Sequence, residues 1–368
     1  MPITLESASA ALGTVLDPEL QRSLNDVGMV RDLSVDGDTA ELTVDLISPS
    51  ATYKDTLDAA INAALREAGA KRVKISFSMA IPTRNILSDD PCPGVKNIVL
   101  VMSGKGGVGK STVAANLTLA LKRMGASVGL LDADMYGPSV PTMLGVAGKP
   151  TSTDGTKFLP LERFGVKLMS IGFLLEDAKS AVVWRGPMLQ NALLQFLRDV
   201  EWGDLDYLIL DLPPGTGDII LTISQKLRTT GAIVVTTPQE VALQDVYKSV
   251  SMAQKVGISL LGVIENESYF ICDGCEKKHT LFGVGGGQKV AEFAQAPLLG
   301  QIPIDPSVRI WGDQGTPVVQ AAPQSSVGKS FMDLAEAVSA EVSKANAARM
   351  GTLTISREGM PTRLPIVR

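Results

Sequence analysis

The sequence contains few of the side chains on which much enzyme chemistry depends. Its 368 residues include one histidine, His279, and three cysteines. A mechanism that needs a histidine therefore has a single position to use. Three cysteines are too few for a disulfide scaffold, so we expect thiols in a reducing compartment that are free, metal-binding or redox-active.

The sequence also lacks a surplus of basic residues and a long apolar run. Lys and Arg number 34 and Asp and Glu number 39, so the formal net charge is −5. This balance argues against nucleic acid as the main partner, because phosphate binding needs a basic face. No run of about 20 apolar residues would span a membrane, and the first residues lack the features of a signal peptide. We therefore expect a cytoplasmic protein with no membrane or nucleic-acid partner.

Residues 1–80 predict a small α+β domain. Apolar spacing predicts helices, and two alternating runs separated by Asp36-Gly37-Asp38 predict a hairpin. The proline-rich stretch 81–96, which contains Cys92, predicts a linker. The expected helices are Thr4–Leu12, Pro18–Leu24 and Tyr53–Ala68, and the expected strands are Val30–Val35, Ala40–Leu46 and Val73–Phe77.

A different pattern runs through residues 97–345. Apolar runs without polar alternation are separated by helix-length segments such as Ser111–Met124 and Glu240–Val256. Such runs are typical of strands buried on both faces of a parallel sheet, so we predict a doubly wound, mainly parallel α/β domain. A last helix is expected at Ser326–Ala345, and the tail 346–368 stays unassigned. The predicted strands are Ile98–Met102, Val128–Leu131, Val166–Ile171, Tyr207–Leu210, Ala232–Val235, Leu260–Ile264 and Pro297–Ile302.

A glycine-rich loop lies between the first of these strands and the first helix. Residues 104–111 read G-K-G-G-V-G-K-S and fit the phosphate-loop pattern G-x-x-x-x-G-K-S/T in the strand–loop–helix context that it requires. Glycines let backbone N–H groups turn toward phosphate oxygens, and the helix N-terminus adds its positive dipole end. Lys110 is expected to pair with the β- and γ-phosphates, and the Ser111 hydroxyl to bind Mg²⁺.

Carboxylates follow two further predicted strands. Asp132 and Asp134 come after one strand and Asp211 after another. Acids at the carboxyl ends of buried parallel strands lie at the mouth of the site, near phosphates and metal. Asp211 is expected to hold Mg²⁺ through water, and the glycines after it predict a switch loop that senses the γ-phosphate. Taken alone, Asp132 and Asp134 would more often be helix caps or surface acids, but beside this loop the functional interpretation is favoured.

The second position of the loop is a lysine, Lys105. With this lysine the loop resembles the deviant Walker A loop of MinD/ParA-type ATPases, in which the corresponding lysine reaches the nucleotide across a dimer. Four later stretches resemble the Mrp/ApbC family of iron–sulfur carrier ATPases. Residues 12–79 resemble the small domain fused in front of these ATPases and shared with iron–sulfur assembly factors, through Asp17-Pro18-Glu19 and 27–30. The four stretches are 202–218, 236–243, 266–270 and 302–306 with 312–315.

The resemblance implies roles for named residues. Lys105, Lys110 and Asp134 would be catalytic, with Asp134 positioning or activating the attacking water. Ser111, Asp132 and Asp211 would organise Mg²⁺, and Asn266 would contact adenine. The residues expected to bind the phosphates of ATP are Gly104, Lys105, Gly106, Gly107, Val108, Gly109, Lys110, Ser111 and Thr112.

Cys272 and Cys275 form a C-x-x-C pair, whose spacing lets two thiolates converge on one metal centre. A [4Fe-4S] cluster usually takes four thiolates, which a symmetric homodimer would supply. This agrees with the family, whose C-x-x-C motif bridges two protomers. Two alternatives stay open: a zinc knuckle formed with His279, and a redox dithiol. Cys92 is expected to be an incidental linker cysteine.

The sequence departs from the family at Ala51, where the front domain usually has a cysteine, at Ile310-Trp311, and in the tail. Our hypothesis is an ATP-dependent carrier that holds a [4Fe-4S] cluster between two protomers and transfers it to apo iron–sulfur proteins, with cluster assembly factors as further partners. The alternative is a MinD/ParA-like switch for localisation or scaffolding, with structural zinc at the cysteine pair. A reductase component with a bridging cluster ranks below both.

Overall fold

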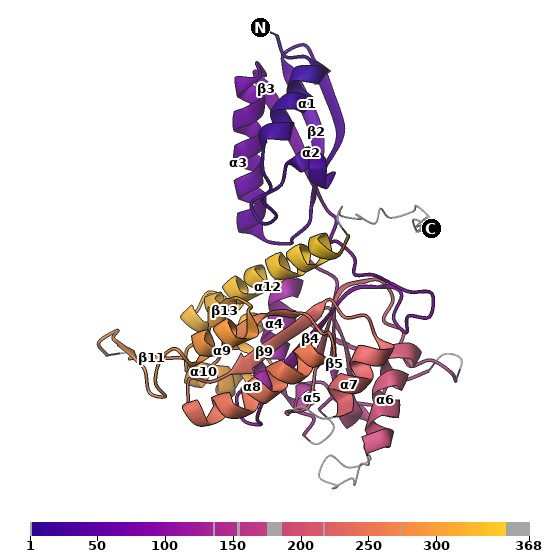
Figure 1. The fold of residues 1–368 in the computed structure, drawn as a ribbon, viewed down its shortest axis with the longest axis vertical. Helices are drawn as coiled ribbons and strands as arrows, with labels where there is room; N and C mark the ends of the chain where they lie inside the picture. Colours follow the sequence, from indigo (N-terminus) through magenta and orange to yellow (C-terminus); the bar gives the residue numbers. More distant parts are fainter. Residues whose placement is uncertain are drawn as a thin grey trace. The chain divides into compact units, whose positions relative to one another are not determined.

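The computed structural model describes residues 2–134, 137–152, 155–174, 186–215, 218–272 and 274–350 (Figure 1). Thr216 and Gly217 of the expected switch loop, Asp273 and the tail 351–368 lie outside the described residues. The chain forms two compact units. One comprises the residues up to Thr83 and those from Val342 onward, and the other comprises Arg84–Glu341.

The first unit is a three-stranded sheet with helices. The strand order is β1-β2-β3, with β1 antiparallel to β2 and β2 parallel to β3. The expected hairpin is confirmed, and Gly37 adopts the left-handed conformation (φ 56°) at its turn. Helix α3 buries side chains four residues apart, including Leu57, Ile61 and Leu65. The elements are α1 Leu5–Thr14, α2 Leu24–Val27, β1 Val30–Asp36, β2 Thr39–Leu46, α3 Ala51–Glu67 and β3 Arg72–Met79.

The helix expected at Pro18–Leu24 is wrong. The buried Asp17 side chain accepts hydrogen bonds from the backbone N–H groups of Glu19 (3.0 Å) and Leu20 (2.7 Å), which hold the segment in a turn. An Asp side chain that bonds to nearby backbone competes with helix formation in this way. The helix begins only at Leu24, after Ser23 caps it.

The second unit alternates strands and helices along the chain. All seven apolar runs predicted as strands form strands. The elements are β4 Val95–Ser103, α4 Lys110–Arg123, β5 Val128–Asp132, α5 Val140–Met143, β6 Leu161–Arg163, β7 Val166–Ser170, the 3-10 turn Ile171–Phe173, α6 Gly186–Asp199, β8 Leu205–Asp211, α7 Asp218–Lys226, β9 Gly231–Thr236, α8 Glu240–Lys255, β10 Leu260–Glu265, β11 Phe270–Ile271, β12 Lys278–His279, α9 Gly286–Ala294, β13 Leu298–Gln301, α10 Pro306–Asp313, α11 Val318–Ala321 and α12 Ser326–Met350.

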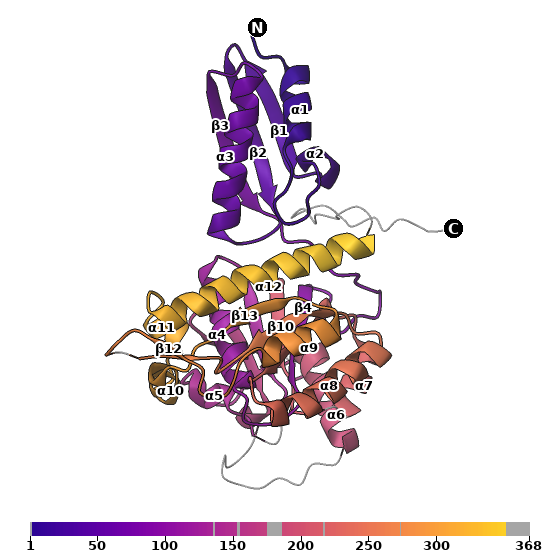
Figure 2. The same cartoon turned by 60° about the vertical axis from the view of Figure 1, so that its left-hand side comes forward.

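Eight of these strands form one sheet in the order β13-β10-β9-β4-β8-β5-β7-β6. All ladders are parallel except that of the edge strand β6, which pairs antiparallel with β7. Right-handed crossovers in opposite directions from the middle of the sheet place α4 on one face and α7 and α8 on the other (Figure 2). The predicted doubly wound α/β fold is thereby confirmed. No helix in the described part of the chain is long and apolar enough to cross a membrane.

Part of the proline-rich stretch before β4 is anchored by buried polar groups. Residues 80–94, all within the described ranges, contain neither helix nor strand. Arg84 is nevertheless buried and forms an ion pair with the buried Asp90, and its guanidinium also donates to the Cys92 carbonyl oxygen (3.0 Å). The Cys92 thiol in turn donates to the carbonyl oxygen of Leu197 in α6 (3.0 Å). From Arg84 onward this stretch is therefore part of the second unit, held by polar contacts.

The final helix continues past the expected end at Ala345, to Met350. Its last turns belong to the first unit. The Ser343 hydroxyl donates to the Ile47 carbonyl oxygen (3.0 Å), and the Asn346 amide donates to that of Pro82 (3.2 Å). Ala347 packs against the apolar core of that unit. Residues 342–350 thus complete a unit that begins more than 250 residues earlier in the chain.

Burial of Cys92 predicts a difference in thiol reactivity. Burial raises the pKa of the Cys92 thiol from its ordinary value of 9.0 to about 12, so it stays protonated at pH 8. Cys272 is half-buried and Cys275 is exposed. We expect iodoacetamide to modify only Cys272 and Cys275 in the native, reduced, metal-free protein, and Cys92 as well in guanidinium, as counted by intact mass.

A Cys92→Ala variant is the control and should give the same two adducts in both states. Because the raised pKa favours the neutral thiol, the stability that burial of Cys92 contributes is complete below about pH 9 and declines toward pH 12. Rapid modification of Cys92 in the native protein would contradict the packing described here.

Candidate functional site

The phosphate loop connects the carboxyl end of β4 to the first turn of α4. Gly107 (φ 84°) and Gly109 (φ 78°) adopt the left-handed conformation, which glycine takes without strain. Gly109 is the N-cap of α4, and within the described residues no side chain caps the helix there. The first N–H groups of α4 therefore point into the loop, an arrangement that binds anions.

Two loop glycines are also required by close contacts. A Cβ at Gly104 would lie 2.3 Å from the Val246 nitrogen in α8. A Cβ at Gly109 would lie 2.2 Å from Nδ2 of Asn266. The loop is consequently in close contact with α8 and with the segment that follows β10. Backbone atoms leave no room for a larger residue at Gly104, and at Gly109 the Asn266 side chain would have to shift.

Lys110 brings three of the predicted site residues together. Its buried ammonium lies 2.5 Å from Oδ1 of Asp211, 3.7 Å from Oδ2 of Asp134 and 3.2 Å from the Ser111 hydroxyl. Lys105, in contrast, is exposed on the loop. The lysine expected to act within the protomer is thus held by carboxylates, and the lysine expected to act across a dimer faces solvent.

Asp211 ends β8 and is fully buried. Burial raises the pKa of its carboxyl group, and the Lys110 ammonium opposes that shift. Its second oxygen, Oδ2, has no hydrogen-bond partner among the residues that the structure describes. A buried carboxylate oxygen without a partner, close to the Ser111 hydroxyl, fits the oxygen ligands that Mg²⁺ prefers.

Asp132 ends β5, and protein groups occupy both of its oxygens. Oδ2 accepts from the Ser170 hydroxyl (3.0 Å) and the Val140 N–H (3.3 Å), and Oδ1 accepts from the N–H of Asp134 (3.1 Å). Burial and the neighbouring Asp211 charge raise the pKa of Asp132 to about 7. Asp132 is therefore placed to fix the loop that carries Asp134, a positioning role beside the metal-shell role that the resemblance implies.

The segment after β10 contributes two polar side chains. The Asn266 amide donates to the Val108 carbonyl oxygen (2.9 Å) and so holds the phosphate loop; its expected adenine contact stays a prediction. The buried Glu265 accepts from the Ser268 hydroxyl (2.5 Å), the Gln301 amide (2.7 Å) and the Gly287 N–H (2.5 Å). The sequence interpretation missed Glu265, although a carboxylate directly after an apolar run is the same signal that identified Asp132 and Asp211.

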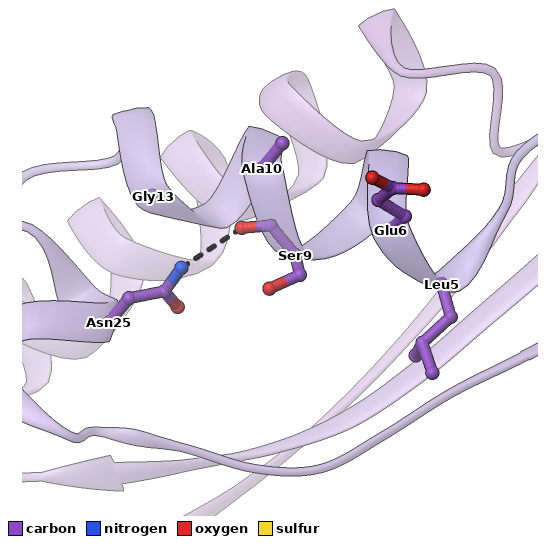
Figure 3. Close-up of a pocket in the computed structure, with 6 residues that line it drawn as sticks. All are labelled: Leu5, Glu6, Ser9, Ala10, Gly13 and Asn25. Carbon is purple, nitrogen blue, oxygen red and sulfur yellow. Dashed lines mark hydrogen bonds between the residues drawn. The ribbon is translucent and has the colours of Figure 1, made fainter.

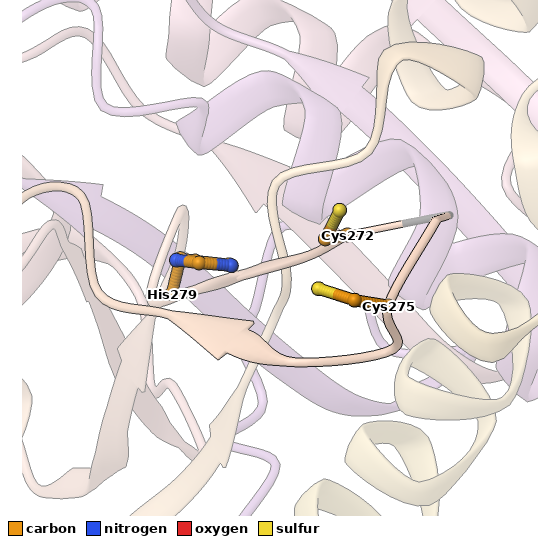
Figure 4. Close-up of side chains that lie close together, drawn as sticks. All are labelled: Cys272, Cys275 and His279. Atoms are coloured by element: carbon orange, nitrogen blue, oxygen red, sulfur yellow. The ribbon is translucent and has the colours of Figure 1, made fainter.

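The two C-x-x-C cysteines lie at the tip of a short hairpin formed by β11 and β12, which extends away from the sheet in Figures 1 and 2. Cys272 is half-buried, and Cys275 and His279 are exposed. The two sulfur atoms and a ring nitrogen of His279 lie within 4.8 Å of one another (Figure 4). The structure thus brings together the three side chains of the zinc knuckle, which the sequence analysis kept as an alternative to the cluster.

The hairpin is anchored by backbone hydrogen bonds to the segment after β13. The Ser268 N–H donates to the Ile302 carbonyl oxygen (2.9 Å), and the Ile304 N–H donates to that of Tyr269 (2.6 Å). Four large apolar side chains nearby in sequence are exposed to solvent. They are Ile271, Leu281, Phe282 and Val284.

A separate hollow lies in the first unit, beside α1 (Figure 3). Asn25 closes one side of it by donating to the Ser9 carbonyl oxygen (2.9 Å). Its lining includes one ionisable side chain, Glu6, and none of the residues that the sequence assigned to nucleotide or metal. The remaining lining residues are Leu5, Ala10 and Gly13.

Comparisons with known proteins agree with both sequence resemblances. Residues 94–339 match the family described as NUBPL iron-transfer P-loop NTPase, and residues 6–77 match the family described as iron-sulfur cluster assembly protein. The iron-sulfur cluster carrier protein of Synechocystis is 42% identical over 350 residues, which are 93% of this chain and 99% of the relative. That of Aquifex aeolicus is 54% identical over 259 residues, 69% of this chain and 70% of the relative.

Among solved structures, a nucleotide-binding protein from Archaeoglobus fulgidus in complex with ADP is similar to part of this chain. It is 40% identical, with a TM-score of 0.53, over 60% of this chain and 87% of that chain. These likenesses confirm the family resemblance, whereas the individual site residues stay predictions.

The two left-handed loop glycines provide a matched pair of substitutions. Gly107→Ala introduces only backbone strain of roughly 1–2 kcal/mol, because nothing lies within 4 Å of the added Cβ. Gly109→Ala adds the collision with Asn266 and breaks its buried hydrogen bond to Val108. We expect Gly109→Ala to lower the free energy of unfolding by about 1–3 kcal/mol more than Gly107→Ala, measured by urea denaturation without nucleotide. Equal losses would show that Asn266 does not hold the loop.

Proposed function

This chain belongs to the family of NUBPL iron-transfer P-loop NTPases, and from that premise we propose that it is an ATP-hydrolysing iron–sulfur cluster carrier. In this proposal a homodimer holds a [4Fe-4S] cluster between its two subunits and passes it to apo iron–sulfur proteins. The match over residues 94–339 and the carrier relatives that align over nearly the whole chain support it.

The observation that carries the proposal is the position of Cys272 and Cys275. Their sulfur atoms lie within 4.8 Å of each other on an exposed hairpin. One chain offers two thiolates here, so a cluster with four thiolate ligands calls for a second copy. The exposed Leu281 and Phe282 flank the hairpin and provide apolar surface for such a partner. An exposed site also suits a cargo that has to leave.

The nucleotide half of the proposal follows from the charges around Lys110. A phosphate would replace Asp211 as the partner of Lys110 and release an Asp211 oxygen for metal. Mg²⁺ would be held by Ser111 and Asp211 and would neutralise phosphate charge when bound. Asp134 would position the water that attacks the γ-phosphorus, and cleavage of the bond to ADP oxygen gives ADP and phosphate. Lys105, being exposed, would reach a nucleotide in the second protomer.

A short chain of contacts connects the two halves. Asn266 holds the phosphate loop through Val108, and the preceding residue, Glu265, holds Ser268 at the start of the cysteine hairpin. In this proposal a change at the loop would pass through these three neighbouring residues to the hairpin strand. Coupling of this kind is reciprocal, so cluster binding would also alter nucleotide affinity.

The first test is anaerobic reconstitution with iron and sulfide, followed by counting iron per dimer. We expect about four irons per wild-type dimer and almost none in a Cys272→Ala/Cys275→Ala double variant. The matched control is Cys92→Ser, which alters the one cysteine outside the hairpin and keeps a donor for Leu197. It should load iron as the wild type does.

Iron loading that survives loss of both hairpin cysteines would contradict the proposed site. ATP-dependent pelleting with liposomes or DNA, together with failure to load iron, would favour the localisation switch instead. Either result would leave the family membership unaffected, because that rests on the whole sequence.

The role of Glu265 in coupling is tested by cluster release. Glu265→Gln keeps the size of the side chain but weakens its charge-assisted hydrogen bonds to Ser268 and Gly287. We expect ATP to change the rate of cluster release to an apoprotein in the wild type and to change it at least threefold less in the variant. Glu267→Gln, an adjacent carboxylate that is half-buried, is the control and should behave as the wild type. Identical release rates with and without ATP in the wild type would refute coupling altogether.

A further inference from the structure

His279 faces the cysteines because of the register of the hairpin. In the antiparallel pair β11–β12, Phe270 lies opposite His279, and Cys272 follows Phe270 by two residues. Side chains two residues apart on a strand, and directly opposite across it, share one face. Cys272 and His279 are therefore diagonal neighbours on the same face, as Figure 4 shows.

The turn between the strands brings Cys275 back to that face. The Cys272 N–H donates to the Lys277 carbonyl oxygen (3.0 Å), and the Cys272 carbonyl oxygen accepts from the Glu276 N–H (2.8 Å). Glu276 has a left-handed conformation (φ 56°), which reverses the chain after Cys275. The backbone conformation of the turn thus sets the positions of the Cα atoms of Cys272 and Cys275.

The resulting distances are close to those of a metal site. All three ligand atoms lie within 4.8 Å of one another. Two sulfur ligands of a tetrahedral zinc ion are about 3.7 Å apart, since each Zn–S bond is about 2.3 Å. Rotation of the three side chains would have to close a remaining distance of about 1 Å at most.

The two lysines of the hairpin lie on different faces. Lys277 lies opposite Cys272 across the hairpin and so shares its face. Lys278 pairs with Ile271, so it lies on the opposite face of the hairpin, and its ammonium sits 3.7 Å from the centre of the Tyr269 ring. Among the described residues, the cluster of potential ligands contains only Cys272, Cys275 and His279. A cation bound by these three would keep one coordination position open, as in zinc sites that exchange ligands.

We propose that a single protomer binds one thiophilic divalent cation, Zn²⁺ or Fe²⁺, through Cys272, Cys275 and His279. This state uses the same hairpin as the proposed cluster but needs neither a second copy nor nucleotide. It differs from the bridging cluster in stoichiometry and in its histidine ligand, because four cysteines from two protomers already complete the cluster. The hairpin would then have two alternative loaded states, one monomeric and one dimeric.

The test is a titration of the reduced, metal-free full chain with Co²⁺, whose absorption reports tetrahedral thiolate coordination, followed by competition with Zn²⁺. We expect one Co²⁺ per protomer in the wild type, with the loaded protein monomeric by light scattering. His279→Ala should lower the Co²⁺ affinity at least tenfold, since it removes a direct ligand. His279 is exposed, so this variant keeps the fold. Lys278→Ala, on the opposite face of the hairpin, is the control and should bind as the wild type does.

Unchanged Co²⁺ affinity in His279→Ala would overturn the inference, as would one metal per two protomers. The cluster measurement separates it from the proposed function. His279→Ala should still load about four irons per dimer, because the cluster does not use the histidine. A wild-type chain that binds Co²⁺ through His279 but takes up no cluster would refute the carrier function and support this inference.

Discussion

Parallel pairing of the strands around β4 is the constraint on which the nucleotide site depends. Because β8, β5, β9 and β10 all run parallel with β4 in the same sheet, their carboxyl ends reach one edge. Asp211 and Asp132 end two of these strands, and the phosphate loop and Asn266 directly follow two others. A helix lies between any two of these four strands along the chain. The site therefore forms only when these strands have paired in the sheet. Its residues are held in place because the strands are buried on both faces of the sheet.

Within that site the charges do not balance. One ammonium, that of Lys110, faces Asp211 and Asp134, and Asp132 lies against Asp211 with its pKa raised to about 7. An anionic nucleotide entering alone would meet this surplus of carboxylates. A divalent cation that enters with the nucleotide would offset this excess negative charge. This is a physical reason for metal and nucleotide to bind together rather than one after the other.

Much of this could be predicted from the sequence because the signals were local. Continuous apolar runs identified every strand of the sheet except the short edge strand β6, and the loop motif placed Lys110 and Ser111 at a helix start. Where a local polar contact competed with periodicity, as at Asp17, the helix prediction was wrong. The long-range contacts could not be predicted: the fold joins Asn266 to Val108 and Cys92 to Leu197, pairs that are more than 100 residues apart in the chain. The roles of individual site residues stay predictions for the same reason, since they concern ligands.

The membership of α12 in both units has a consequence for the order in which the chain becomes structured. Most of the first unit is synthesised before the second unit, yet the contacts of Ser343 with Ile47 and of Asn346 with Pro82 belong to it. Its sheet and α3 can form early, but the unit is completed only after the whole sheet of the second unit has been synthesised. Part of the surface of the first unit therefore stays uncovered until residues 342–350 of α12 have been made.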